Sequence, residues 1–307
     1  MKVLVTGATG YIGSNVRGYI KEMGHDVRLF VRLSSEDKID TSDSYEVVTG
    51  DIFDTNACLA ACDGCDVVVH LVGIAREFPA KGITFDQYHR AATENIINAA
   101  KIGGVPHFIH MSALGTRDNA PSIYHQSKFT GEEVVRQSGL RWTIFRPSWI
   151  FGEGDHGTKL IVNLIHKPVV PLVNGGSMML QPISIDDVCA AVSKSIEMPE
   201  TQGKTFELGG PDRIAFKDIV GQIASQLGVS IRTMNVSSAM IRPVVAMMER
   251  YPWFPVSTDQ LRLLTEDNVC GIDPFVKTFQ IEPKPFSQII PTLFGSTGAR
   301  RKTPALL

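Results

Sequence analysis

The stretch Thr6-Gly7-Ala8-Thr9-Gly10-Tyr11-Ile12-Gly13 decides the fold of this chain of 307 residues. It follows a run of β-branched and aliphatic residues at 3–6 and precedes an amphipathic segment at 12–23, so the glycines join a strand to a helix. A Cβ would obstruct a tight turn, close approach to a pyrophosphate or packing of helix on strand. Free amides at the helix N-terminus would bind the phosphates. The loop predicts a dinucleotide site formed by Gly7, Thr9, Gly10, Tyr11, Ile12 and Gly13.

Short β-branched runs alternate with longer helical stretches through the first half of the chain. We expect strands at residues 3–6, 27–31, 46–49, 67–70, 108–111 and 143–145, and helices at 12–23, 85–101 and 125–137. Right-handed βαβ units place helices on both faces of a parallel sheet. The sequence therefore predicts an α/β protein with a doubly wound Rossmann domain over 1–150. A smaller mixed α/β lobe over 151–294, with some segments returning to the main sheet, would close over the ligand, and 295–307 would form a flexible tail.

The residues that follow the second and third expected strands bear on the choice of nucleotide. An NAD-selective site places an acidic side chain at the end of the second strand, against the ribose 2′-hydroxyl. Here the strand ends in Val31 and Arg32. Arg32 would pair with a 2′-phosphate, so the sequence favours NADP(H) over NAD(H); the alternative is an ordinary surface arginine. Asp51 would accept a hydrogen bond from the adenine amine or cap the next helix, and Ile52 beside it is expected to contact the nucleotide.

Tyr124 and Lys128 lie four residues apart in an expected helix, and residues with that spacing share one helical face. A phenol is a poor acid and base near neutral pH, but a nearby ammonium and an oxidised nicotinamide ring both favour its ionised form. Tyr124 is therefore the candidate acid/base and Lys128 its activator and a ligand of the nicotinamide ribose. Ser112, after the fifth expected strand, would polarise a substrate carbonyl or hydroxyl. Alone, such a pair is typical of a solvated helix face, so its meaning depends on the glycine loop.

Together these residues resemble the short-chain dehydrogenase/reductase superfamily, and the Gly-x-x-Gly-x-x-Gly spacing is similar to its extended branch. Residues 66–73 are similar to the fourth-strand motif, 145–152 to the sixth-strand motif and 181–188 to the segment that returns to the sheet. The resemblance implies that the cofactor also contacts Leu71, Val72, Gly73, Pro147 and Ile150. It implies an NADP(H)-dependent oxidoreductase, or an enzyme like the sugar-nucleotide epimerases and dehydratases, that acts on a small molecule.

Two departures from the extended pattern argue against epimerase chemistry. His89 precedes Thr93 by four residues, where extended members carry an asparagine, and Ser112 and Tyr124 lie closer together than in the epimerases. The combination, with residues 255–264, is similar to an atypical subgroup that contains the dehydrogenase-like accessory subunit of mitochondrial complex I and bacterial relatives named as sugar-nucleotide epimerases. Because the nucleotide of that subunit is thought to be structural, the resemblance also implies an alternative: a non-catalytic NADP(H)-binding structural or regulatory protein with an assembly partner.

Composition narrows the partners and the compartment. Thirty basic and thirty-two acidic residues give a net charge of −2, which attracts neither nucleic acid nor an anionic membrane. Five cysteines are too few for a disulfide framework, and the N-terminal strand leaves no room for a signal segment, so we expect a cytoplasmic protein. We expect it to be a monomer or a homodimer. The apolar stretch 239–248 is too short to span a bilayer. Residues 240–248, with Trp253 and Phe254, favour core or lid, although peripheral membrane association and docking of a partner stay open.

No metal site is expected. Cys58, Cys62 and Cys65 have the spacing of an iron–sulfur motif. The first two fall on an expected short helix and the third at the turn into the next strand, so small apolar core residues are the better interpretation. The histidines lack the spacing of a zinc site, and no Gly-x-Ser-x-Gly elbow supports a serine hydrolase.

Overall fold

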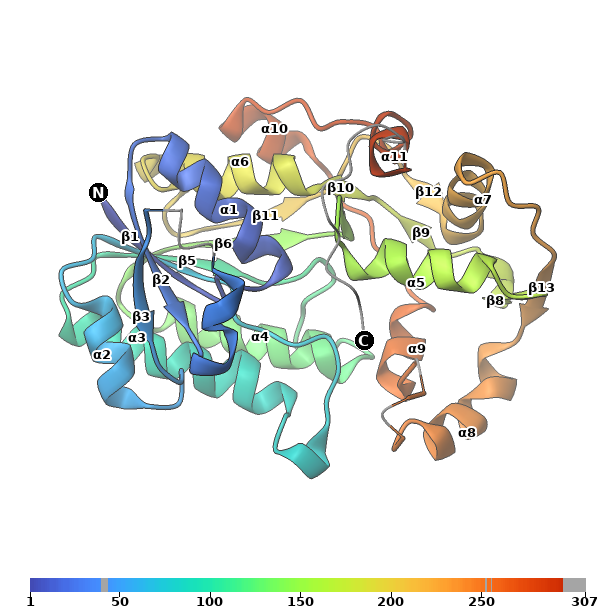
Figure 1. Ribbon diagram of the computed structural model, residues 1–307, viewed down its shortest axis with the longest axis horizontal. Helices are drawn as coiled ribbons and strands as arrows, with labels where there is room; N and C mark the ends of the chain where they lie inside the picture. The colour runs from blue at the N-terminus through green and yellow to red at the C-terminus, as the bar shows by residue number, and fades with distance from the viewer. Residues whose placement is uncertain (40–43, 252, 255, 295–307) are drawn as a thin grey trace.

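The largest element of the molecule is a parallel sheet of seven strands, which lies at the left of Figure 1. The computed structural model describes residues 1–39, 44–251, 253–254 and 256–294. The sheet order is β11-β6-β5-β4-β1-β2-β3. The strands are β1 (Lys2–Thr6), β2 (Asp26–Val31), β3 (Glu46–Thr49), β4 (Val67–His70), β5 (His107–Met111), β6 (Arg141–Pro147) and β11 (Lys204–Leu208). The order reverses between β1 and β4, and ligands of doubly wound sheets bind beside such a switch point. The predicted Rossmann fold is confirmed.

Helices cover both faces of the sheet because its apolar residues alternate in direction. Val3 and Val5 of β1 belong to the apolar cluster that contains Val16, whereas Leu4 between them belongs to the cluster that contains Ile96. The helices that contribute to the first cluster are α1 (Tyr11–Glu22), α6 (Ile185–Ser195) and α10 (Asp273–Phe279). Those on the opposite face in Figure 1 are α2 (Thr55–Cys62), α3 (Ala92–Ile102) and α4 (Ile123–Arg136).

One predicted helix is not uniform. The segment expected to be helical over 85–101 begins with a π-helical turn, η3 (Asp86–Ala91), which runs into α3. Such wide turns are rare and frequently lie at functional sites. The turn contains His89, whose ring is held from both sides, by Ser127 of α4 and by the backbone of Ile74. The wider turn thus accommodates a side chain that links three elements.

The later part of the chain forms a third apolar cluster beside the sheet. Phe151, Ile161, Ile219 and Phe286 belong to it. The helices of this part are α5 (His156–Ile165), α7 (Phe216–Gln226), α8 (Ser238–Met248), α9 (Thr258–Leu263) and α11 (Phe286–Phe294). The short strands pair as β7 (Ile150–Phe151) with β10 (Ile183–Ser184), β8 (Val170–Val173) with β13 (Thr233–Val236), and β9 (Met179–Leu180) with β12 (Ile214–Ala215).

Three later elements lie with the main sheet rather than in the second lobe. β11 pairs with β6, α6 packs on α1, and α10 packs on β11 and α6. The division of the chain into lobes at residue 150 stays a prediction, and the predicted tail 295–307 lies outside the described residues. The remaining elements are the short helical turns η1 (Leu33–Lys38), η2 (Pro79–Lys81), η4 (Asn174–Gly176) and η5 (Pro199–Thr201).

The cysteines are buried free thiols. Those of Cys58 and Cys65 donate to the backbone carbonyls of Ile52 and Ala61. Over the described ranges, no three histidine, cysteine or acidic side chains are grouped to hold a metal ion. In the same ranges, no helix has the length and apolarity needed to cross a membrane.

The close contact between the glycine loop and α1 makes a testable prediction. A Cβ at Gly13 would overlap the Gly7 carbonyl oxygen and lie 2.7 Å from the Ala8 Cα, so we expect Gly13→Ala to lower the free energy of unfolding by about 1–3 kcal/mol. A Cβ at Gly18 of the same helix meets nothing within 4 Å, so Gly18→Ala, the matched control, should raise it by about 0.5–1 kcal/mol. Urea denaturation measures both, and equal stability of the two variants would contradict the packing argument.

Candidate functional site

The predicted site residues lie together at the carboxyl ends of the sheet strands. Because the strands are parallel, their carboxyl ends lie on the same side. The candidates follow successive strands: Gly7 after β1, Arg32 after β2, Asp51 after β3, Leu71, Val72 and Gly73 after β4, Ser112 after β5, and Pro147 at the end of β6. The predicted cofactor and catalytic residues therefore surround the switch point between β1 and β4.

The glycine loop forms a cradle that fits a pyrophosphate. Gly7 has a φ of +70°, and a Cβ there would lie 2.9 Å from the carbonyl carbon of Leu71. α1 begins after Gly10 with no side-chain cap and no acidic residue in its first turn. The first amides of α1 and the positive end of its dipole are thus available to an anion. The Tyr11 side chain points away toward Gly152, and Ile12 lines the cavity described below.

The side chains expected to select the nucleotide are exposed at the ends of β2 and β3. The Arg32 side chain is exposed and forms no hydrogen bond or ion pair with any described residue, whereas its backbone carbonyl accepts the amide of Ser35. Asp51 is also exposed, and its Oδ1 accepts a hydrogen bond from the backbone amide of Phe53. The alternative that Asp51 caps the next helix is wrong, because Asp54 caps α2. The side chain of Ile52 is buried in the core, so its predicted contact with the nucleotide would fall on its backbone.

Lys128 is buried where β4 and β5 end. Its Nζ donates a hydrogen bond to the carbonyl of Met111 at 3.1 Å and would lie 3.0 Å from a Cβ placed on Gly73. Burial lowers the pKa of Lys128 to about 8, and the charge of Glu132, one turn further along α4, opposes that shift. The ammonium therefore lies beside Gly73, in the segment that the resemblance assigns to cofactor binding.

Tyr124 and Ser112 line one cavity. The Tyr124 ring makes edge contacts with the rings of Phe85 and His89, at centroid distances of 5.7 and 5.5 Å. Burial raises the pKa of Tyr124 to about 12, and Lys128 is not among the groups that shift it. The activation of Tyr124 by Lys128 stays a prediction, since the ammonium donates to the Met111 carbonyl. The Ser112 hydroxyl donates to Thr116 Oγ1.

His89 occupies the place of the missing asparagine and connects three elements. Its Nδ1 is 2.8 Å from Ser127 Oγ of α4, and its Nε2 lies within hydrogen-bond distance of the backbone of Ile74, after β4. Burial and the neighbouring Lys128 ammonium lower the pKa of His89 to about 2, so the ring is neutral. His89 is thus a buried histidine, and its hydrogen bonds hold η3, α4 and the loop after β4 together.

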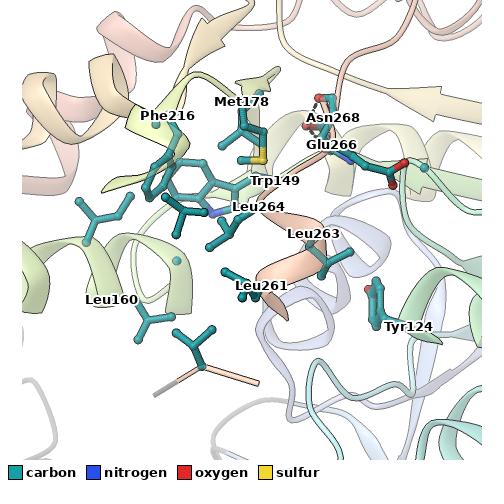
Figure 2. Close-up of a pocket in the computed structure, with 18 of the residues that line it drawn as sticks. Tyr124, Trp149, Leu160, Met178, Phe216, Leu261, Leu263, Leu264, Glu266 and Asn268 are labelled. Atoms are coloured by element: carbon teal, nitrogen blue, oxygen red, sulfur yellow. Dashed lines mark hydrogen bonds between the residues drawn. The ribbon is translucent and has the colours of Figure 1, made fainter. Parts of the chain in front are cut away.

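A cavity of about 960 Å³ extends from the sheet edge into the second lobe. Five predicted residues line it on the sheet side: Ile12, Ser112, Tyr124, Pro147 and Ile150. The opposite walls come from residues that the sequence analysis did not assign, among them Trp149, Met178, Phe216, Leu263 and Leu264 (Figure 2). Figure 2 shows Tyr124 at one side of this space, with Trp149, Met178 and Phe216 further away. Ordinary apolar residues in the second lobe carry no motif that would have identified them.

Asp259 is a further residue whose role the sequence analysis did not assign. Its carboxylate accepts hydrogen bonds from the backbone amides of Ile123 and Tyr124 at 2.7 and 3.0 Å, across 136 and 135 residues of chain. It thereby ties α9 to the N-terminus of the helix that carries Tyr124. The segment 255–264 was noted as similar to the atypical subgroup, and this contact gives that segment a structural role; Pro255 lies outside the described residues.

Helix α8 forms part of the cavity wall, as the lid interpretation of residues 240–248 expects. Ile241 and Val245 line the cavity, whereas Met240 and Met247 are exposed on the outer side. Arg76, in the loop after β4, donates hydrogen bonds to the backbone carbonyls of Glu249 and Phe254. The inner face of α8 thus lines the cavity and its outer face is exposed, while the role of α8 as a lid stays a prediction.

Fold and site together define a dinucleotide-binding protein of the extended short-chain dehydrogenase/reductase superfamily. The chain belongs to the NAD(P)H-binding family, whose pattern it matches over residues 7–199.

Known proteins with different functions are similar to this chain. The mitochondrial NADH-ubiquinone oxidoreductase 40 kDa subunit of Neurospora crassa is 29% identical over 287 residues, covering 91% of this chain and 75% of that protein. The 3 beta-hydroxysteroid dehydrogenase/Delta 5-->4-isomerase of Mycobacterium tuberculosis is 25% identical, covering 81% and 75%. The NADPH-dependent quinone oxidoreductase of Escherichia coli, solved with NADPH, has a TM-score of 0.77 at 18% identity, covering 95% and 99%, and shows the same fold.

The buried Lys128 predicts a pH dependence of stability. An unfolded lysine ionises near pH 10.4, about its usual value, whereas burial lowers the pKa of Lys128 to about 8 in the folded protein. Between these values the unfolded chain binds more protons, so this lysine makes stability rise with pH. The free energy of unfolding of wild type minus that of Lys128→Met should therefore increase from about pH 8 upward.

Urea denaturation across that pH range measures the difference. Replacement of the exposed Lys101 by Met is the matched control, because it removes a lysine from the surface of α3. A wild-type minus Lys128→Met difference that stays constant with pH would contradict the burial of a charged Lys128.

Proposed function

We propose that this protein is an NADP(H)-dependent oxidoreductase that acts on a small molecule through Tyr124, Lys128 and Ser112. The observation that carries the proposal is the shared lining of one cavity by Ile12, from the nucleotide loop, and by Ser112 and Tyr124. A substrate in this cavity would contact both reactive hydroxyls beside the nucleotide site. Similar proteins include a hydroxysteroid dehydrogenase and a quinone oxidoreductase, which support redox chemistry, as well as sugar-nucleotide epimerases. The histidine at position 89, in place of the asparagine of extended members, argues against epimerisation.

In the proposed reaction each side chain has one task. The glycine loop 7–13 and Lys128 would hold NADPH, which would supply the hydride for the carbonyl carbon of the substrate. Ser112 Oγ donates a hydrogen bond to the substrate oxygen, and Tyr124 Oη gives that oxygen a proton, so that the carbonyl becomes an alcohol. Lys128 holds the nicotinamide ribose, and its positive charge favours the tyrosinate that remains. In the reverse direction Tyr124 accepts the proton.

The proposed preference for NADP(H) rests on Arg32. Because this exposed guanidinium has no partner among the described residues, a 2′-phosphate would gain a charge-assisted hydrogen bond. Arg32→Ser should weaken NADPH binding by roughly ten- to a hundredfold and leave NADH binding unchanged. Titration calorimetry with both nucleotides measures this, with the exposed Arg242→Ser of α8 as the control. Equal losses for NADPH and NADH would refute the 2′-phosphate contact.

A second candidate is a non-catalytic NADP(H)-binding protein that stabilises or regulates an assembly. The raised pKa of Tyr124 favours it, as does the Lys128 ammonium bound to a backbone carbonyl. The similarity to the Neurospora protein, a subunit of NADH-ubiquinone oxidoreductase, favours it too. The predicted cytoplasmic location, the monomeric or dimeric state and the absence of nucleic-acid binding stay predictions under both candidates.

Removal of the Tyr124 hydroxyl distinguishes the proposed oxidoreductase from the non-catalytic nucleotide-binding protein. Tyr124→Phe should lower the rate of NADPH oxidation with carbonyl substrates by about a hundredfold or more, because it removes the proton donor. The affinity for NADPH should not change. Absorbance at the reduced-nicotinamide band measures the rate. Unchanged turnover in a variant that still binds NADPH would defeat the catalytic role and favour the structural candidate.

A further inference from the structure

We propose that the cavity binds an elongated apolar ketone or alcohol, with its oxygen at Ser112 and Tyr124 and its apolar body between α5, α8 and α9. The inference rests on the proposed function in one respect, because it takes Ser112 and Tyr124 as the reacting end. It goes further by assigning a chemical class to the substrate and by excluding a sugar nucleotide.

The walls away from Tyr124 are apolar and come from several elements. Met178 and Phe216 lie on one side, Ile241 and Val245 on α8, and Leu264 after α9. In Figure 2 the leucines of α9 lie between Tyr124 and the Trp149 region. Ligand sites of this volume are lined by apolar side chains with a few convergent polar groups that orient the ligand. A ligand that fills the cavity must therefore present apolar surface over most of its length.

The charged lining residues already have partners or lie at the rim. Among the described residues that line the cavity, the arginine and lysine side chains are Arg117 and Lys167. Arg117 pairs with Glu266 at 2.6 Å and also donates to the carbonyl of Gly115, and Lys167 is exposed beyond α5. The carboxylate of Asp267 accepts the amide of Met179. A nucleoside diphosphate needs several unpaired cations around its phosphates. Among the described lining residues, Arg117 is paired, and Lys167, which has no ion pair, lies exposed at the rim.

Two unpartnered polar groups of the described lining are adjacent in the chain, the Tyr124 hydroxyl and the buried Nδ1 of His125. Ser148 donates to Asn268, which in turn donates to the carbonyl of Leu114, so these groups satisfy one another. The Tyr124 hydroxyl forms no hydrogen bond with any residue that the structure describes, and Ser112 lines the same cavity. A carbonyl or hydroxyl oxygen at this end would accept a hydrogen bond from Tyr124, and the Ser112 hydroxyl, which donates to Thr116 Oγ1, would turn toward that oxygen.

Exposed lining residues indicate where such a ligand enters. Leu160 of α5 and Val244 of α8 both line the cavity and are 55% and 54% exposed. In Figure 1, α5 lies above α8, and the chain from β13 leads down to α8. The apolar end of a long ligand would thus face the mouth between α5 and α8.

Binding of 2-alkanones of increasing length tests the proposed class. Titration calorimetry on the NADP⁺-saturated full chain would compare 2-pentanone with 2-nonanone. Each methylene that enters the cavity should tighten binding by about fourfold, and four methylenes by on the order of a hundredfold. UDP-glucose should give no binding heat under the same conditions. Affinity that does not depend on chain length, or UDP-glucose that binds as tightly as 2-nonanone, overturns the proposal.

A pair of identical substitutions locates the binding. Met178→Gln places an amide in the apolar wall and should weaken 2-nonanone binding about tenfold, with little effect on 2-pentanone. Met247→Gln, on the 57% exposed outer side of α8, is the matched control and should change neither affinity. Thermal unfolding of each variant checks its fold. Equal effects of the two substitutions would place the ligand elsewhere and overturn the proposal.

These binding results are independent of turnover. A protein that binds 2-nonanone with the expected dependence on length but reduces no ketone keeps the apolar ligand and loses the proposed oxidoreductase activity. A protein that reduces small polar carbonyls without any gain from chain length keeps that activity and loses the apolar ligand.

Discussion

The contact of the Gly7 carbonyl with the first turn of α1 fixes the geometry on which the rest of the site depends. That carbonyl accepts the amide of Gly10 at 3.0 Å and leaves no room for a Cβ at Gly13. The Gly7 Cα also lies against Leu71, at the end of β4. One turn therefore sets the separation of β1, α1 and β4 at the switch point. Because the turn uses backbone atoms alone, the amides of α1 stay open to an anion.

The second constraint is the burial of Lys128, which depends on how α4 is held. Burying an ammonium costs free energy, and here a carbonyl bond to Met111 and the charge of Glu132 offset part of that cost. Glu132 is itself buried and bonded to Arg146 of β6, so the position of Lys128 follows from the packing of α4 on the sheet. Asp259 binds the first amides of the same helix. The second lobe thus helps to position the helix that carries both Tyr124 and Lys128.

The sequence predicts those parts of the molecule that local chemistry determines. The glycine loop, the six strands of the first half and the helices between them follow from periodicity and from steric limits on glycine, and their observed ends differ from the expected ends by about two residues at most. The choice of Asp54 over Asp51 as the α2 cap was not predictable, because both side chains suit a cap and the turn between them decides. The role of His89 depends on a π-helical turn, and that of Asp259 on a contact across 135 residues. Neither leaves a pattern within a short window of sequence.

The contacts that keep the cavity open explain why the sequence alone did not predict which side chains line it. Protein interiors normally close apolar voids, because unfilled space forfeits dispersion contacts. Here polar anchors hold the walls apart: Asp259 fixes α9 to α4, and Arg76 fixes the segment after α8 to the β4 loop. Since these anchors are hydrogen bonds to backbone groups, they set the width of the cavity without specifying what lines it. The lining side chains are therefore free to be apolar, and a ligand that buries their surface replaces the contacts that the anchors prevent them from making with one another.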